Sequence, residues 1–86
     1  MSLSILICDD SSFARKQMAR ALPEEWEVDI SFAKNGQEAI NVIQTTNADI
    51  LFLDLNMPVM DGFQTLQEIR RLDLNTLVIV VSADIQ

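Results

Sequence analysis

Residues 50–62 read ILFLDLNMPVMDG, and this stretch decides which fold can be predicted. An apolar run at 50–53 leads directly to Asp54, and turn residues beginning with Pro58 follow. A short apolar run bounded in this way is typical of a strand buried on both faces of a parallel sheet. Because proline cannot extend a central strand, we expect the strand to end near Leu55. Asp54 is then at the carboxyl end of the strand, where open α/β sheets bind ligands, and it could ligate a metal, act as a nucleophile or cap the next loop.

Composition limits the remaining possibilities. The chain has 86 residues, enough for one small domain, and its 49% content of hydrophobic residues indicates a globular rather than a disordered protein. Thirteen acidic residues against six basic ones give a net charge of −7, which argues against nucleic-acid binding. Histidine is absent and Cys8 is the only cysteine, so histidine-based catalysis and an intramolecular disulfide are excluded, and a zinc site is argued against.

The sequence gives no sign of a membrane protein. No apolar run approaches the roughly 18 residues that a spanning helix needs, and the first residues lack the basic and long apolar segments of a signal peptide. A cytoplasmic location is therefore the expectation.

Strand-like and helix-like segments alternate along the chain. The predicted strands are residues 3–8, 27–32, 50–53 and 77–81. Apolar residues recur at helical spacing after each of the first three strands, at Ala14, Met18, Ala21 and Leu22, then at Ala39, Ile40 and Ile43, and finally at Phe63, Leu66, Ile69 and Leu72. This βαβαβαβ pattern predicts an α/β fold with a parallel sheet, right-handed crossovers and helices on both faces.

The second strand differs from the others because apolar and polar residues alternate along it. Val28, Ile30 and Phe32 would lie on one face, with Asp29 and Ser31 on the other, as in a half-exposed edge strand. The spatial order of the strands is then expected to be 2-1-3-4, with the first and third strands adjacent in the middle.

This order would bring three carboxylates together, since Asp9 and Asp10 end the first strand and Asp54 ends the third. Close carboxylates repel one another, and a hard divalent cation such as Mg²⁺, which prefers oxygen ligands, relieves that repulsion. A central aspartate beside bound Mg²⁺ suits transfer of a phosphoryl group to its carboxylate. Ser82, at the end of the fourth strand, could hydrogen-bond that group.

Four segments carry a resemblance to a known family: ILICDDS, FAKNGQEAI, LFLDLNMPVMDG and VIVVSA. Together they span almost the whole chain, which resembles the receiver domain of two-component response regulators, a flavodoxin-like fold of order 2-1-3-4-5. The resemblance implies a metal site of Asp9, Asp10, Asp54 and the backbone carbonyl of Asn56, a phosphoacceptor at Asp54, a switch hydroxyl at Ser82, and a loop shaped by Pro58 and Gly62.

The implied function is that of a phosphorelay switch. A histidine kinase or histidine phosphotransfer protein would phosphorylate Asp54 with the help of Mg²⁺, and the domain would assist its own phosphorylation and dephosphorylation without being a conventional enzyme. Receivers also have a fifth strand ending in a lysine, an aromatic switch residue and two more helices. Residues 1–86 include none of these, and their lysines are Lys16 and Lys34. We therefore expect an incomplete receiver domain, whose exposed fourth strand favours dimerisation or swapping.

Alternatives remain at this stage. The chain could be a receiver-like module that docks or dimerises without switching. A phosphatase of the haloacid dehalogenase type also has an aspartate after an apolar strand, but it needs a second acid two residues later, where this chain has Asn56. Asp9 and Asp10 could be helix-capping residues, and Ser82 a turn residue. The cationic side chains of the first predicted helix, Arg15, Lys16 and Arg20, are interpreted as a solvated face or as a docking surface for the phosphodonor.

Overall fold

The structure, a computed structural model, describes residues 2–55 and 61–81. Its elements alternate in the predicted way. They are β1 (Leu3–Cys8), α1 (Ser12–Ala21), β2 (Val28–Ala33), α2 (Gly36–Thr46), β3 (Ile50–Asp54), α3 (Gly62–Arg71) and β4 (Leu77–Val81).

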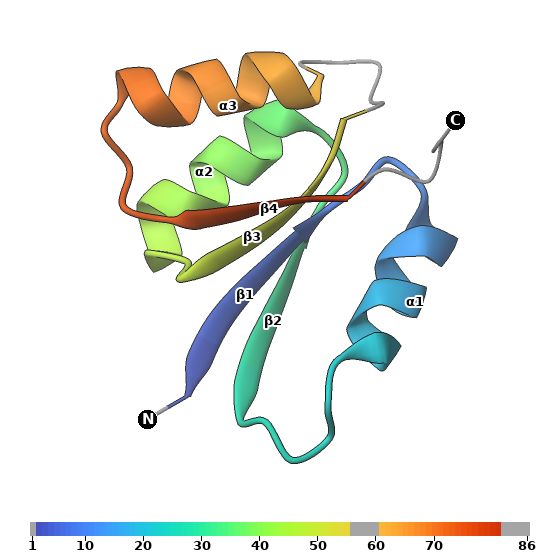
Figure 1. Ribbon diagram of the computed structural model, residues 1–86. Coiled ribbons are helices and arrows are strands. Elements are labelled where there is room, and N and C mark those ends of the chain that lie inside the picture. The colour runs from blue at the N-terminus through green and yellow to red at the C-terminus, as the bar shows by residue number, and fades with distance from the viewer. Residues whose placement is uncertain (1, 56–60, 82–86) are drawn as a thin grey trace.

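The strands form one parallel sheet in the order β2-β1-β3-β4, which confirms the predicted order. Helices α2 and α3 cover one face of the sheet and α1 lies against the other (Figure 1). In the register of the two central strands, Cys8 of β1 is opposite Leu53 of β3. The residues that directly follow this pair, Asp9 and Asp54, are therefore neighbours at the carboxyl edge of the sheet.

The hydrophobic core lies between the sheet and the two helices α2 and α3. Leu6 and Leu51, from the central strands, are fully buried there, because both faces of these strands are covered. Their apolar runs are continuous for the same reason. The remaining buried members of this cluster are Cys8, Ala33, Ala39, Ile40, Ile43, Ala48, Leu53 and Ile69.

The opposite face is covered less completely, because α1 is its only described helix (Figure 1). No residue of α1 is fully buried, and Phe32 of β2 is 46% exposed. The predicted bounds of β2, residues 27–32, were one residue early. The buried residue of β2 is Ala33, which lies on the face that α2 covers. The apolar residues that alternate along the strand, Val28, Ile30 and Phe32, are not fully buried.

Strand β4 is an edge of the described sheet, paired only with β3. Its apolar side chains include Leu77 at 62% exposure and Val80 at 47%. Dimerisation or swapping through this edge stays a prediction. None of the described helices is both long and apolar enough to cross a bilayer.

Local capping fixes where the helices begin. The side chain of Ser11 accepts a hydrogen bond from the backbone N–H of Ala14 at the start of α1. Asp61 caps α3 in a reciprocal capping box with Gln64, in which each side chain accepts from the other residue's backbone N–H. The Ser11 cap lies two residues after Asp9, so it fixes the start of α1 beside the carboxyl edge of the sheet.

Candidate functional site

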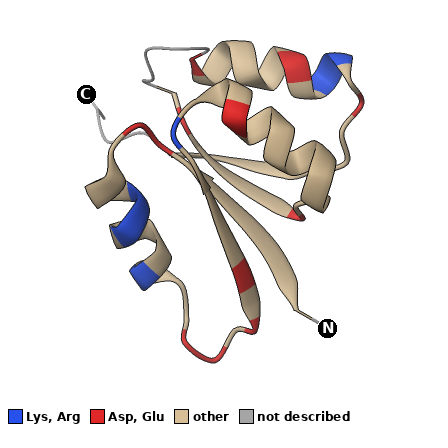
Figure 2. Ribbon diagram, turned by 180° about the vertical axis from the view of Figure 1, so that it is seen from behind, with Lys and Arg blue, Asp and Glu red and all other residues tan. Residues whose placement is uncertain are grey.

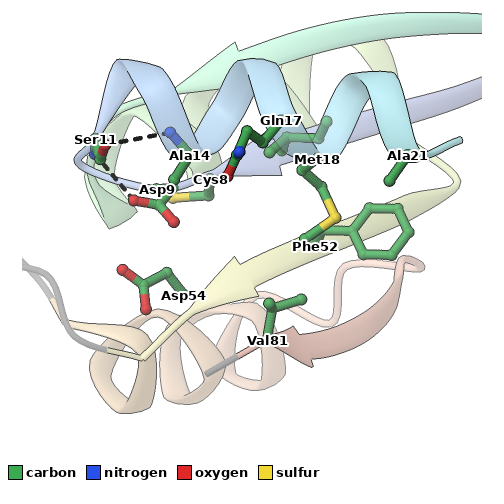
Figure 3. Close-up of a pocket in the computed structure, with 11 residues that line it drawn as sticks. Cys8, Asp9, Ser11, Ala14, Gln17, Met18, Ala21, Phe52, Asp54 and Val81 are labelled. Atoms are coloured by element: carbon green, nitrogen blue, oxygen red, sulfur yellow. Dashed lines mark hydrogen bonds between the residues drawn. The ribbon is translucent and has the colours of Figure 1, made fainter. Parts of the chain in front are cut away.

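The carboxyl edge of the two central strands brings three acidic side chains together. Asp9 and Asp10 follow β1, and Asp54 is the last residue of β3. One carboxylate oxygen from each residue lies within 4.8 Å of the others. The sequence-predicted trio is therefore one cluster in the structure, and Figure 3 shows the carboxylates of Asp9 and Asp54 facing each other across the end of a pocket.

Asp9 is held from both of its neighbouring elements. Its backbone N–H donates to the carbonyl oxygen of Ala33 at 3.1 Å, which extends the β1–β2 pairing by one residue. Its Oδ1 accepts from the backbone N–H of Ser11 at 2.9 Å, and its carbonyl oxygen accepts from Nη1 of Arg15 at 2.6 Å. The turn between β1 and α1 is thus closed around Asp9, while Asp10 stays exposed to solvent.

Asp54 owes its place to the close packing of the first residue of α3 on the end of β3. The N–H of Gly62 donates to the carbonyl oxygen of Leu55 at 3.3 Å. A Cβ on Gly62 would lie 2.6 Å from Cα of Leu55 and 2.9 Å from the carbonyl oxygen of Asp54. Glycine at this position is therefore required by close approach, which sets the position of the backbone that carries Asp54.

The cluster sits at one end of a cavity of about 550 Å³ between α1 and the sheet. Ala14 and Met18 of α1 line one wall, and Phe52 and Val81 of the sheet line the other (Figure 3). The charged residues of the lining are Asp9 and Asp54, and apart from Ser11 and Gln17 the other lining residues are apolar or Cys8. A cation would therefore bind at the end that holds the carboxylates.

Electrostatics in the cluster disfavour its fully ionised form. Partial burial raises the pKa of the Asp9 carboxyl above its usual value, the N–H of Ser11 opposes this, and the charges of Asp54 and Asp10 raise the pKa further. Burial, with the nearby charge of Asp9, raises the pKa of the Cys8 thiol to about 12. The Cys8 thiol is therefore protonated at neutral pH, and it donates a hydrogen bond to the carbonyl oxygen of Asn35.

The donor set fits a magnesium ion. It consists of carboxylate oxygens only, with no histidine in the chain and with the thiol of Cys8 protonated. Neither Asp9 nor Asp10 forms an ion pair with any residue that the structure describes, so no side-chain cation neutralises these two carboxylates. A divalent cation would relieve the repulsion from Asp54 and Asp10, which adds to the effect of burial in raising the pKa of Asp9.

Two predicted site residues, Asn56 and Ser82, lie outside the described residues, as does Pro58. Their proposed roles stay predictions. Sequence reasoning missed Arg15 as part of the site, because it placed this residue on a solvated or docking face. The signal that could have found it is its position six residues after Asp9, one helical turn beyond the Ser11 cap.

Asp9→Asn is expected to raise the melting temperature at pH 7 in the absence of divalent cations. Because the pKa of Asp9 is raised on folding, ionisation of Asp9 destabilises the fold above the raised pKa, and this penalty vanishes below the pKa of the unfolded chain. The wild type should therefore lose more stability than the variant as pH rises through that window, and thermal unfolding followed by circular dichroism measures this. Glu24→Gln, at an exposed loop position, is the control for net charge, and equal stabilisation by both variants would contradict the account.

Comparison with known proteins agrees with this geometry. The profile of the response regulator receiver domain family matches residues 5–86. The chain is 40% identical over 82 residues to a protein-glutamate methylesterase/protein-glutamine glutaminase of Bacillus subtilis, covering 94% of this chain but only 23% of that protein. It is 31% identical over 83 residues to the chemotaxis protein CheY of Halobacterium salinarum, covering 96% of this chain and 68% of the relative.

Solved structures show the same fold. The receiver domain of the response regulator NarL from Mycobacterium tuberculosis superposes with a TM-score of 0.88 at 30% identity, over 99% of this chain and 69% of that one. The response regulator domain of Thermotoga maritima CheB gives a TM-score of 0.85 at 28% identity, over 96% and 62% of the two chains. With the strand order and the profile match, these likenesses show that the chain belongs to the response regulator receiver domain family.

Proposed function

We propose that the chain is a phosphoacceptor module of a two-component phosphorelay, in which Asp54 receives a phosphoryl group. The observation that carries the proposal is the convergence of Asp9, Asp10 and Asp54 at the carboxyl edge of the central strands. Membership of the receiver family supports it. The phosphodonor would be a histidine kinase or a histidine phosphotransfer protein.

In the proposed reaction a carboxylate oxygen of Asp54 attacks the phosphorus of a phosphohistidine. The new O–P bond forms as the P–N bond breaks, and the electron pair of that bond leaves with the histidine nitrogen. Asp9 and Asp10, with Asp54 and the carbonyl of Asn56, would hold Mg²⁺, which when bound neutralises charge on the phosphoryl oxygens. Ser82 would hydrogen-bond the transferred group and couple it to a change of conformation.

The proposed output is a change of shape rather than turnover of a small-molecule substrate. Asp54 would be regenerated by hydrolysis of its acyl phosphate, a step that the domain assists. A docking or dimerisation module without switching is the second candidate, and the exposed side chains of Leu77, Ile79 and Val80 on β4 favour it. The two candidates differ in one measurable property, because a docking module needs no phosphoryl transfer.

Intact mass after incubation with acetyl phosphate and Mg²⁺ tests the proposal. The wild type should gain one phosphoryl group, and Asp54→Asn should gain none because the amide is not a nucleophile for phosphorus. Asp73→Asn is the matched control, since it removes the same charge at an exposed position where φ is 53°, a conformation that asparagine tolerates. Absence of any gain by the wild type in Mg²⁺ would contradict the proposal and leave the docking module.

A further inference from the structure

We propose that Arg15 is a positioning residue that holds the acidic cluster in the geometry needed for a divalent cation. The inference rests on the proposed function only in taking Asp9, Asp10 and Asp54 as the cation site. Arg15 lies in the second turn of α1 and is half-buried, with its guanidinium directed at the end of β1.

The contact is made to the backbone of Asp9. Nη1 of Arg15 donates to the Asp9 carbonyl oxygen at 2.6 Å, and the backbone N–H of Arg15 donates to the carbonyl oxygen of Ser11 at 3.0 Å. The N–H of Ser11 donates in turn to Oδ1 of Asp9. These three bonds close the segment from residue 9 to residue 15 on itself, so the first acid of the cluster is fixed to α1 as well as to β1.

The position of this contact explains why a side chain makes it. Asp9 lies one residue beyond the end of β1, and its N–H completes the pairing with β2 at Ala33, the last residue of that strand. The carbonyl oxygen of Asp9 therefore lies at the point where the strand pairing ends and the chain turns toward α1. A hydrogen bond from a charged donor at this point is stronger than one between neutral groups.

Arg15 does not act as a counter-ion to the carboxylates by direct contact. The ion pairs of residues 2–55 and 61–81 are Lys34 with Glu38 and Arg71 with Glu68, and neither includes Arg15. Figure 2 shows basic residues clustered on α1, while acidic residues lie at the strand ends and loops as well as on β2, α2 and α3. The guanidinium is thus a nearby positive charge that is bonded to a carbonyl group.

These two properties predict opposite effects on cation binding. A nearby positive charge repels Mg²⁺, so if Arg15 were only that, its removal would tighten Mg²⁺ binding. If Arg15 positions Asp9 and Asp10, its removal would loosen the site and weaken Mg²⁺ binding. Loss of a group that supports metal ligands typically weakens metal affinity by about 10–100-fold.

The test is isothermal titration calorimetry with Mg²⁺ on the whole chain, comparing the wild type with Arg15→Met, Arg15→Lys and Arg70→Met. We expect Arg15→Met to bind Mg²⁺ about 10-fold more weakly than the wild type. Arg15→Lys should lie between them, because an ammonium can still donate to the carbonyl but with poorer geometry. Arg70→Met removes the same charge from an exposed position on α3 and should bind Mg²⁺ like the wild type.

Circular dichroism at the titration temperature establishes that each variant is folded, and Arg15→Lys alone decides the matter if Arg15→Met does not fold. Unchanged or tighter binding by the Arg15 variants would overturn the inference and leave the proposed function intact if the wild type is phosphorylated. Weaker binding by the Arg15 variants, with no phosphorylation of the wild type, would support the inference and overturn the proposed function. A wild type that binds no Mg²⁺ would overturn the inference.

Discussion

Gly62→Ala is expected to lower the free energy of unfolding by about 1–3 kcal/mol and to weaken Mg²⁺ binding as well. The added Cβ would lie 2.6 Å from Cα of Leu55 and 2.9 Å from the carbonyl oxygen of Asp54, distances that real Cβ atoms do not adopt. No described glycine has a positive φ, so the cost arises from overlap and not from backbone strain. Either β3 or α3 must move, and Asp54 is at the point of contact.

Urea unfolding and Mg²⁺ titration measure the two effects of Gly62→Ala. Gln67→Ala is the control, because it adds no overlap at an exposed position of the same helix and alanine has the higher helix propensity. Gly62→Ala should be the less stable of the two and the weaker in binding Mg²⁺. A variant as stable as the wild type would show that α3 packs on β3 differently from the arrangement described above.

Leu51→Ala should lower the free energy of unfolding by about 2–5 kcal/mol, which is more than the loss expected for Gly62→Ala. Leu51 is fully buried in the core between the sheet and the two helices α2 and α3, where a truncated side chain leaves a cavity. A domain of this size has little stability to lose, and domains usually melt at about 45–65 °C. A loss of this size would bring the melting temperature of the variant near or below 37 °C, so the variant is expected to be mostly unfolded at that temperature.

Leu77→Ala provides the comparison for Leu51→Ala, since it makes the same change on β4 at a side chain that is 62% exposed. Its effect should stay within about 0.5 kcal/mol, as for other surface substitutions. Thermal unfolding of both variants measures the difference. Equal destabilisation would contradict the burial described here, because it would mean that Leu77 is covered in the folded protein.

Much of the fold could be predicted because the order of apolar and polar residues along each strand indicates whether one or both of its faces are buried. Continuous apolar runs ending at Asp9 and Asp54 predicted central strands, and the structure confirms both. The alternation of the second strand predicted its edge position, which is confirmed. Its buried residue could not be predicted, because the exposure of Phe32 depends on how much of the sheet α1 covers rather than on the pattern of the strand itself.

The candidate site was predicted in part. The proximity of Asp9, Asp10 and Asp54 could be predicted, because the strand order determines which strand ends are neighbours. The hydrogen bond from Arg15 to the carbonyl oxygen of Asp9 could not be predicted. A long charged side chain on an amphipathic helix is expected to be solvated unless the conformation of the turn before the helix is known. The capping box of Asp61 with Gln64 was not predicted, although the three-residue spacing fits that motif.

The central claim is that Asp54 carries the phosphoryl group. The most direct measurement is borohydride reduction of protein treated with acetyl phosphate and Mg²⁺, followed by peptide mass spectrometry, because reduction converts an aspartyl phosphate into homoserine at the modified position. The account predicts homoserine at residue 54 in the wild type and none after chelation of Mg²⁺. Homoserine at residue 9 or 10, or at no position in Mg²⁺, would contradict it.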